Sequence, residues 1–174
     1  MQNRTLRQLT AAGVIAAAYA ALSLVLAPIT FGPVQCRISE ALTLLPVISP
    51  AAIWGVTLGC AVTNGVGAAT GANFLGLVDL PVGTAATLLA AVATRLLGKI
   101  RFGGLPWLSA LPPILINAVA IGGEWCYAMT GSINGAFWVF AGQIALEQLP
   151  PCLLGVWLVG LLERRSLQTI IEGK

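Results

Sequence analysis

Long apolar stretches recur along the chain, and they constrain its fold more than any other feature. They include Leu9 to Ala27, Leu80 to Leu97 and Ala136 to Leu162. Each approaches or exceeds the about 20 residues that a helix needs to cross about 30 Å of hydrocarbon. Only 9% of the residues are charged, whereas soluble domains carry about 25%. The sequence therefore predicts one integral membrane domain over residues 1–174, with an all-α fold.

Proline, glycine and other turn residues divide these stretches into six helical segments. The segments are 8–27, 39–49, 50–66, 80–98, 108–129 and 136–163. Residues 39–66 allow two interpretations. They form either one helix about 42 Å long, or a hairpin that turns near Ser49 and Pro50 and has two short arms.

The basic residues favour the hairpin, because short cytoplasmic loops collect Lys and Arg. With six crossings and a cytoplasmic N-terminus, the following basic residues all lie in the cytoplasm: Arg4, Arg7, Arg95, Lys99, Arg101, Arg164, Arg165 and Lys174. Only Arg37 then lies outside. We therefore expect a six-helix transmembrane bundle in the cell membrane with both termini cytoplasmic. The outer connections, 28–38, 67–79 and 130–135, are expected to form a lid.

Ionisable side chains are rare in these segments, and each is a candidate functional residue because burying a charge in a membrane is costly. The candidates are Arg37, Glu40, Asp79, Glu124 and Glu147.

Two helical stripes contain further candidates. Asn117 and Glu124 are seven residues apart and share a helix face, with Tyr127 three residues on. Phe140, Gln143 and Glu147 form a comparable stripe on the last helix. With Trp125, Trp138 and the outer connections above them, the two stripes predict an outward-opening pocket that binds a small solute.

Structural interpretations of the same residues remain open. Arg37 and Glu40 are three residues apart and can pair with each other. Asp79 can cap the start of its helix. Trp125, Tyr127 and Trp138 can belong to the aromatic belt at the membrane interface.

Several kinds of site are excluded or have no support. The chain has no histidine, which excludes a histidine-based catalytic triad, and its four cysteines stand singly, so we expect no metal site. Gly98 and Lys99 are followed by Ile100 and are not part of a nucleotide-binding loop. We expect no cofactor, no enzymatic activity and no nucleic-acid partner, because the positive charge follows membrane topology.

The first helix has small residues at regular spacing. Ala12, Ala16 and Ala20 repeat every four residues, so one face of the helix allows another helix to approach closely. The neighbour is either a helix of the same chain or a separate subunit, and we interpret the face as a docking site for a partner.

Residues 37–43 read R-I-S-E-A-L-T, and this run is fairly specific. Through it the sequence resembles the substrate-binding S components of energy-coupling factor (ECF) transporters, and within them the queuosine-precursor (QueT) branch. Further similarity lies in residues 55–64, Asp79 with 83–91, and 111–117, and the resemblance extends over the whole chain.

This resemblance implies uptake of a 7-deazaguanine such as preQ1, queuine or queuosine, together with a transmembrane T subunit and two ATPase subunits. It also implies that Arg37, Glu40, Asp79, Asn117 and Glu124 occupy polar positions of the family. Whether Gln143 or Glu147 matches the family's polar position on the last helix stays open.

Two other functions remain as alternatives. In the first, the chain is an S component that binds another vitamin-like solute. In the second, the chain is a stand-alone secondary transporter in which Glu124 or Glu147 carries a proton.

Overall fold

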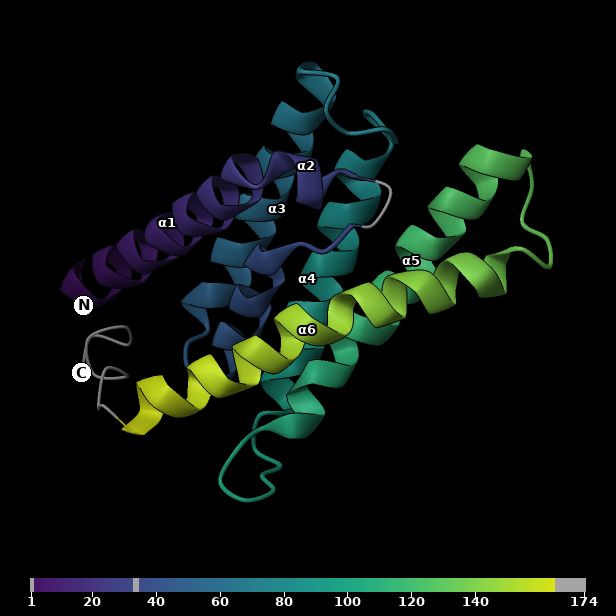
Figure 1. Cartoon of the computed structure of the whole chain (residues 1–174). Helices are drawn as coiled ribbons and strands as arrows, with labels where there is room; N and C mark the ends of the chain where they lie inside the picture. The colour runs from purple at the N-terminus through teal and green to yellow at the C-terminus, as the bar shows by residue number, and fades with distance from the viewer. Residues whose placement is uncertain (1, 33–34, 165–174) are drawn as a thin grey trace.

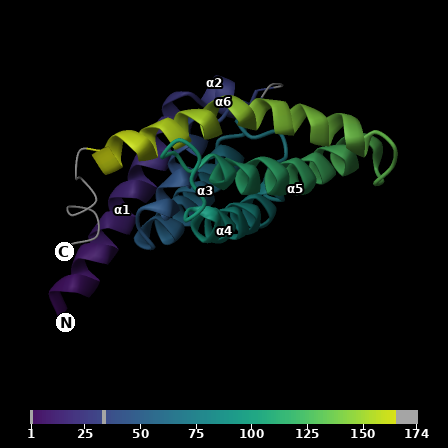
Figure 2. The same ribbon diagram turned by 90° about the horizontal axis from the view of Figure 1, so that it is seen from below.

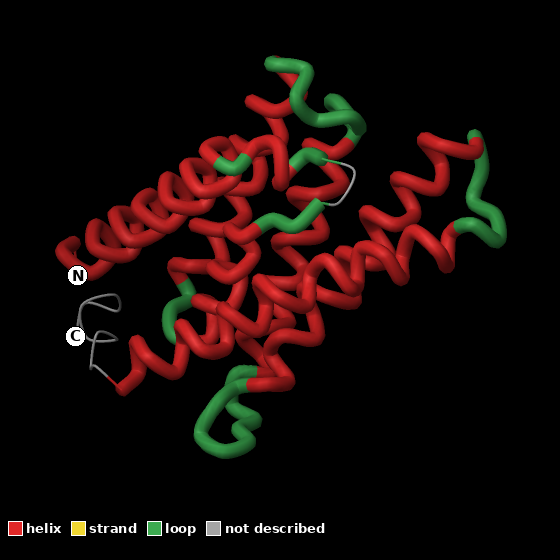
Figure 3. The backbone as a smooth tube through the Cα atoms, in the orientation of Figure 1, coloured by secondary structure: helices red, strands yellow, loops and turns green. Residues whose placement is uncertain are grey.

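Every secondary-structure element in the described part of the chain is a helix, which confirms the all-α prediction (Figures 1 and 3). The structure is a computed structural model, and it describes residues 2–32 and 35–164. Its elements are α1 (Gln2–Val25), α2 (Ala27–Thr30), η1 (Ile38–Val47), α3 (Ala51–Ala69), α4 (Asp79–Leu97), η2 (Trp107–Ala110), α5 (Leu111–Thr130) and α6 (Phe137–Arg164). The two elements named η are 3-10 helices.

Five helices of the described chain are long and apolar enough to cross a membrane. They are α1, α3, α4, α5 joined to η2, and α6. The chain is therefore a multi-pass membrane protein. The expected segments 8–27, 50–66, 80–98, 108–129 and 136–163 correspond to these five helices.

The second expected helix, 39–49, differs from the prediction. Ile38–Val47 is a 3-10 helix of 10 residues, which spans only about 20 Å at a rise of about 2.0 Å per residue. The expectation of six spanning helices is therefore only partly met. The hairpin interpretation of residues 39–66 is the better one, because the chain turns between η1 and α3.

The position of η1 explains how this apolar helix can carry three polar residues. It packs against α1, α3, α4 and α6 inside the bundle, where Ser39, Glu40 and Thr43 are buried. Its end lies beside the end of α4, because Arg95 Nη1 donates a 2.8 Å hydrogen bond to the carbonyl of Pro46. The short helix thus takes the chain through the protein interior from one end of the bundle to the other.

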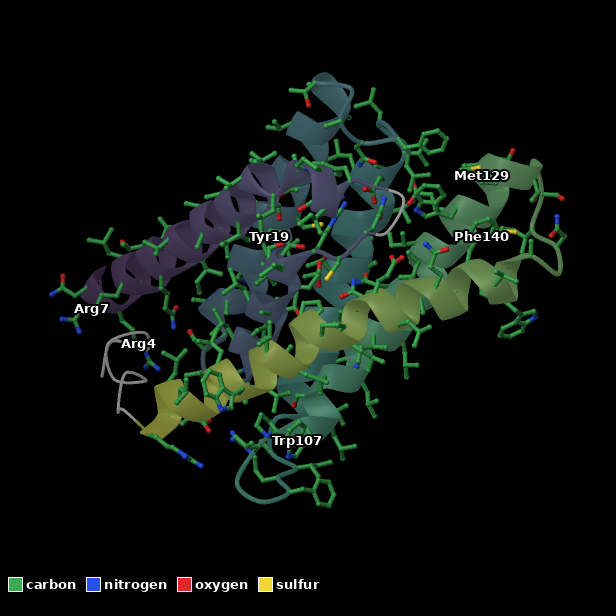
Figure 4. All side chains as sticks on the ribbon, in the orientation of Figure 1. Arg4, Arg7, Tyr19, Trp107, Met129 and Phe140 are labelled. Carbon is green, nitrogen blue, oxygen red and sulfur yellow. The ribbon has the colours of Figure 1, made fainter. Side chains whose placement is uncertain are left out.

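The connections fall at two opposite ends of the molecule (Figures 1 and 2). The start of α1, the last turn of α6 and the connection from α4 to η2 lie at one end. The segment between α3 and α4 and the connection between α5 and α6 lie at the other. Figure 4 shows Arg4, Arg7 and Trp107 at the first end and Met129 and Phe140 at the second.

Apart from Arg37, the described basic residues lie at the end of the molecule that carries the start of α1 and the last turn of α6. Arg165 and Lys174, which the topology prediction also used, lie outside the described residues. An ion pair fastens this end. Arg101 donates to both carboxylate oxygens of Glu163, at 2.7 and 2.8 Å, and these hydrogen bonds raise the pKa of Arg101. The pair holds the connection after α4 against the end of α6.

The alanine repeat of α1 packs inside the chain, against α3. Ala12 and Ala20 are buried, and a Cβ atom at Gly59 would lie 2.6 Å from Tyr19 Cβ and 3.0 Å from the carbonyl oxygen of Ala16. The neighbour of this face in the described chain is therefore a helix of the same chain, and a role of the face in docking a partner stays a prediction. Small residues are needed here because α3 approaches the backbone of α1.

Replacing Gly59 with Ala should destabilise the protein by about 1–3 kcal/mol, because the added methyl group overlaps Tyr19 and forces the two helices apart. The matched control is Gly13→Ala on the same helix pair, where an added Cβ meets nothing within 4 Å. That variant should keep or slightly raise stability. Thermal unfolding can be followed by dye labelling of the buried thiols of Cys60, Cys126 and Cys152. Equal melting temperatures for the two variants would contradict the close α1–α3 contact.

Candidate functional site

A cavity of about 470 Å³ opens near the end of the molecule that carries the α5–α6 connection. Its wall is formed by the segment between α2 and η1, by the segment between α3 and α4, and by the facing sides of α5 and α6. The lining residues are Phe31, Gly32, Gln35, Phe74, Trp125, Met129, Phe140, Gln143, Ile144 and Glu147. We call it the large cavity. Its volume suits a small organic solute.

One wall of the large cavity is aromatic. The ring of Trp125 lies 5.3 Å from that of Phe74 with an interplanar angle of 13°, and 6.4 Å from that of Phe140 with an angle of 23°. Figure 4 shows Phe140 on α6, near Met129 on α5. Three nearly parallel rings, from the α3–α4 segment, α5 and α6, are stacked on one another, and a planar ring can extend this stack.

The polar part of the large cavity is centred on Glu147. Its Oε1 accepts a 2.8 Å hydrogen bond from Gln143 Nε2, and its Oε2 accepts a 3.1 Å bond from the backbone N–H of Gln35. Within the described residues the ion pairs are Arg37–Asp79 and Arg101–Glu163. The carboxylate of Glu147 is thus held by neutral donors alone, and both Gln143 and Glu147 line the cavity.

A buried ion pair lies deeper in the bundle. Arg37 Nη2 is 3.1 Å from Asp79 Oδ2, and Asn73 Nδ2 donates a 2.7 Å hydrogen bond to the same oxygen. The Arg37 guanidinium also lies over the Phe31 ring, 5.4 Å from its centroid. The segment before η1 and the segment before α4 are therefore joined to the first turn of α4.

These contacts correct two sequence-based interpretations. Arg37 pairs with Asp79 and not with Glu40, whose Oε1 accepts a hydrogen bond from the hydroxyl of Tyr19. Asp79 lies in the first turn of α4 and its side chain makes no capping hydrogen bond. The pairing of Arg37 with Glu40 assumed that both belong to one helix, whereas Arg37 lies before η1 and has an extended backbone, with φ −82° and ψ 100°.

A second, small cavity of about 20 Å³ adjoins the large one, because Gln35 and Ile144 line both. Its lining residues are Gln35, Arg37, Glu40, Asp79, Gly83, Thr87, Asn117, Ile121, Ile144 and Gln148. Four of the predicted site residues meet here: Arg37, Glu40, Asp79 and Asn117.

Three predicted residues do not line either cavity. Tyr127 and Trp138 are 63% and 77% exposed, as expected of residues in an aromatic belt. Glu124 lies within electrostatic range of Asp79 and Arg37. Both of its carboxylate oxygens are buried and have no hydrogen-bond partner among the described residues.

Sequence reasoning placed two rings of the aromatic wall, Trp125 and Phe140, in the expected pocket and missed the third. Phe31, Phe74 and Met129 were not singled out. Phe31 and Phe74 could have been found from their position in the outer connections 28–38 and 67–79, which were expected to form a lid. Gln35 was also missed, because its contribution includes a backbone N–H group.

The charges around the two cavities are unequal. Three carboxylates, those of Glu40, Asp79 and Glu147, belong to the lining residues, and Arg37 is the one basic residue among them. In the described part of the chain, no three Cys, Asp or Glu side chains are grouped so that they would hold a metal ion. The arrangement is suited to binding a planar solute that donates hydrogen bonds or carries positive charge.

Comparisons with known proteins identify the family. No curated protein matches the chain, and no solved structure matches it. A family model described as QueT transporter matches residues 9–164, which include all five candidate spans nearly in full and every residue that lines the two cavities. The chain therefore belongs to the QueT transporter family, a family of membrane transporters.

Proposed function

We propose that the chain is the substrate-binding S component of an ECF transporter, and that it imports a queuosine precursor or a related 7-deazaguanine such as preQ1, queuine or queuosine. The observation that carries this proposal is the composition of the large cavity. An aromatic wall made by Phe74, Trp125 and Phe140 accompanies a carboxylate–amide pair, Glu147 and Gln143, in one space of about 470 Å³.

The chemistry of a deazaguanine complements both parts of the cavity. The edge of a guanine-like ring presents N–H and NH₂ donors side by side, and a carboxylate accepts them in a bidentate manner. Glu147 is the carboxylate that lines the cavity, so we assign this role to it instead of Glu124. The ring stacks on Trp125 or Phe140, an interaction worth about 1–3 kcal/mol per base.

The unequal charge supports a cationic substituent on the solute. Three lining carboxylates face a single guanidinium, and uncompensated carboxylates are costly in a membrane protein. An aminomethyl cation on the deazaguanine supplies the missing positive charge and also interacts favourably with aromatic faces.

Energy for uphill transport comes from partner subunits in this proposal. The sequence has no nucleotide-binding loop, so a T subunit and two ATPase subunits drive the cycle. The end that carries the basic residues faces the cytoplasm, and the large cavity faces outward. Transport requires the solute to bind with different affinity in the two orientations, because equal affinity shifts no equilibrium.

One observation favours a different mechanism, stand-alone secondary transport. Glu124 lies in a membrane-spanning helix, and its buried carboxylate has no hydrogen-bond partner among the described residues. Such a group is suited to carrying a proton. In this alternative Glu124 couples solute movement to a proton gradient and no ATPase is needed.

Replacing Glu147 with Gln should weaken preQ1 binding by about 10- to 100-fold, because a donor replaces one acceptor and a charge-assisted hydrogen bond is lost. The matched control is Glu124→Gln, which removes the same charge from a residue outside the cavity lining and should bind within a few-fold of wild type. Calorimetric titration of the purified chain with preQ1, queuine and guanine measures both. A larger loss in Glu124→Gln would return the recognition role to Glu124.

Replacing Trp125 with Leu should weaken binding by about 5- to 150-fold, because stacking worth about 1–3 kcal/mol is removed. Trp138→Leu is the control, since Trp138 is exposed on the outer side of α6. Quenching of tryptophan fluorescence by the solute should disappear in the Trp125 variant and persist in the Trp138 variant. Unchanged quenching in the Trp125 variant would exclude Trp125 as the stacking platform.

Uptake of labelled preQ1 distinguishes the two mechanisms. Cells that produce this chain together with a T subunit and two ATPases should accumulate the solute, and an ATPase variant without hydrolysis should not. Accumulation by the chain alone, abolished by Glu124→Gln, would overturn the S-component proposal in favour of proton-coupled transport.

A further inference from the structure

The small cavity behind the floor of the large cavity is lined by four polar residues that are at least nine-tenths buried. Gln35 and Arg37 come from the segment before η1, Glu40 from η1, and Asp79 from the first turn of α4. Their side chains meet where three parts of the chain join. The cavity measures about 20 Å³.

Each of these four residues has one polar atom with no hydrogen-bond partner among the described residues. Glu40 uses Oε1 to accept from Tyr19, and its Oε2 is unpartnered. Asp79 uses Oδ2 to bind Arg37, and its Oδ1 is unpartnered. The unpartnered donors are Arg37 Nε and Gln35 Nε2. The lining residues thus contribute two donors and two acceptors that are shielded from bulk solvent.

The structure assigns this small cavity as the binding site of a single ordered water molecule. A water molecule accepts two hydrogen bonds and donates two, which matches the two donors and two acceptors. One water needs about 10–15 Å³ measured in this way, together with 2–4 polar partners, and the small cavity provides both. A second water would not fit.

The donor groups argue against a metal cation at the same place. A cation is held by oxygen acceptors, but half of the unpartnered atoms are N–H donors, and one of them belongs to a guanidinium that is always charged. A water molecule satisfies all four groups, whereas a cation would satisfy two and repel the others.

The water joins the parts of the chain that form the floor of the large cavity. It links Gln35 and Arg37 to Glu40 on η1 and to Asp79 on α4, beside the direct Arg37–Asp79 ion pair. Buried waters of this kind are costly to remove because they satisfy groups that have no other partner. This water-mediated link does not depend on which solute binds, and the proposal is the same for the ECF mechanism and for proton-coupled transport.

A crystal structure of the full chain at about 2 Å resolution or better tests the assignment directly. One isolated density peak is expected within about 2.6–3.2 Å of Glu40 Oε2, Asp79 Oδ1, Arg37 Nε and Gln35 Nε2. Crystals grown with rubidium in place of sodium and potassium should show no anomalous peak there. An anomalous peak would reveal a cation site, and either a cavity without density or direct pairing of the four groups would also overturn the proposal.

The variant Gln35→Met provides a second measurement that needs no crystal. If the water is bound, this change removes one of its partners and should lower Tm by about 2–4 °C in a chain of this size. If the site is dry, the change removes an unsatisfied buried donor, and Tm should stay the same or rise. An unchanged or higher Tm in the folded variant would therefore contradict the water site.

Discussion

The ion pair between Arg37 and Asp79 is the interaction on which the arrangement around both cavities depends. It lies inside the bundle, where its side chains are 9% and 1% exposed. A buried ion pair recovers its desolvation cost only if the remaining polar atoms also find partners. Asn73 donates to the same Asp79 oxygen that binds Arg37, and the proposed water molecule supplies a partner for Asp79 Oδ1 and Arg37 Nε. The pair thereby fixes two outer segments relative to α4, and those segments supply Phe31, Gln35 and Phe74 to the large cavity.

The enclosure of η1 by other helices explains how this apolar element can carry Ser39, Glu40 and Thr43. A helix that faces lipid must be apolar around most of its surface, but η1 is enclosed by four other helices. It can therefore present Glu40 to Tyr19 on α1 and Ser39 to Ser23, whose hydroxyl oxygens are 2.6 Å apart. These hydrogen bonds replace those that lipid cannot provide.

Hydropathy correctly located five of the six expected spanning helices, because the bilayer imposes a length and a composition on each of them. The spacing of Phe140, Gln143 and Glu147 also correctly predicted a shared face on α6, since positions three, four and seven apart lie on one side of a helix. All three residues line the large cavity.

The sequence-based site predictions were wrong for two reasons. Some residues were grouped because they are close in sequence although they lie on different sides of a helix, and some contacts join residues that are far apart in the sequence. Trp138 precedes Phe140 by two residues, which is about 200° around the helix, so it lies on the opposite side and is exposed. Tyr127 stands in the same relation to Trp125. The partner of Arg37 is 42 residues away in the sequence, and no local pattern could have identified it.

The alanine repeat illustrates a further limit of sequence reasoning. Small residues every four positions establish that something approaches a helix closely, but they do not identify the neighbour. Here the complementary glycines, Gly55 and Gly59, belong to α3 of the same chain, and a Cβ atom at Gly55 would lie 2.8 Å from Ile15 Cβ. The small residues of α1 and the glycines of α3 form two faces that pack against each other.

The unequal charge around the cavities connects the fold with transport. The fold satisfies Asp79 with Arg37 and Glu40 with Tyr19, but it supplies only neutral donors to Glu147. A carboxylate held in this way remains able to accept hydrogen bonds from a solute, because neither oxygen is engaged by a cation. A fully paired Glu147 would stabilise the protein more and would bind a cationic or donor-rich solute less. We therefore propose that the Glu147 carboxylate, held by neutral donors alone, is what makes the α5–α6 end of the bundle a receptor. The Arg37–Asp79 ion pair beneath it holds the site in shape.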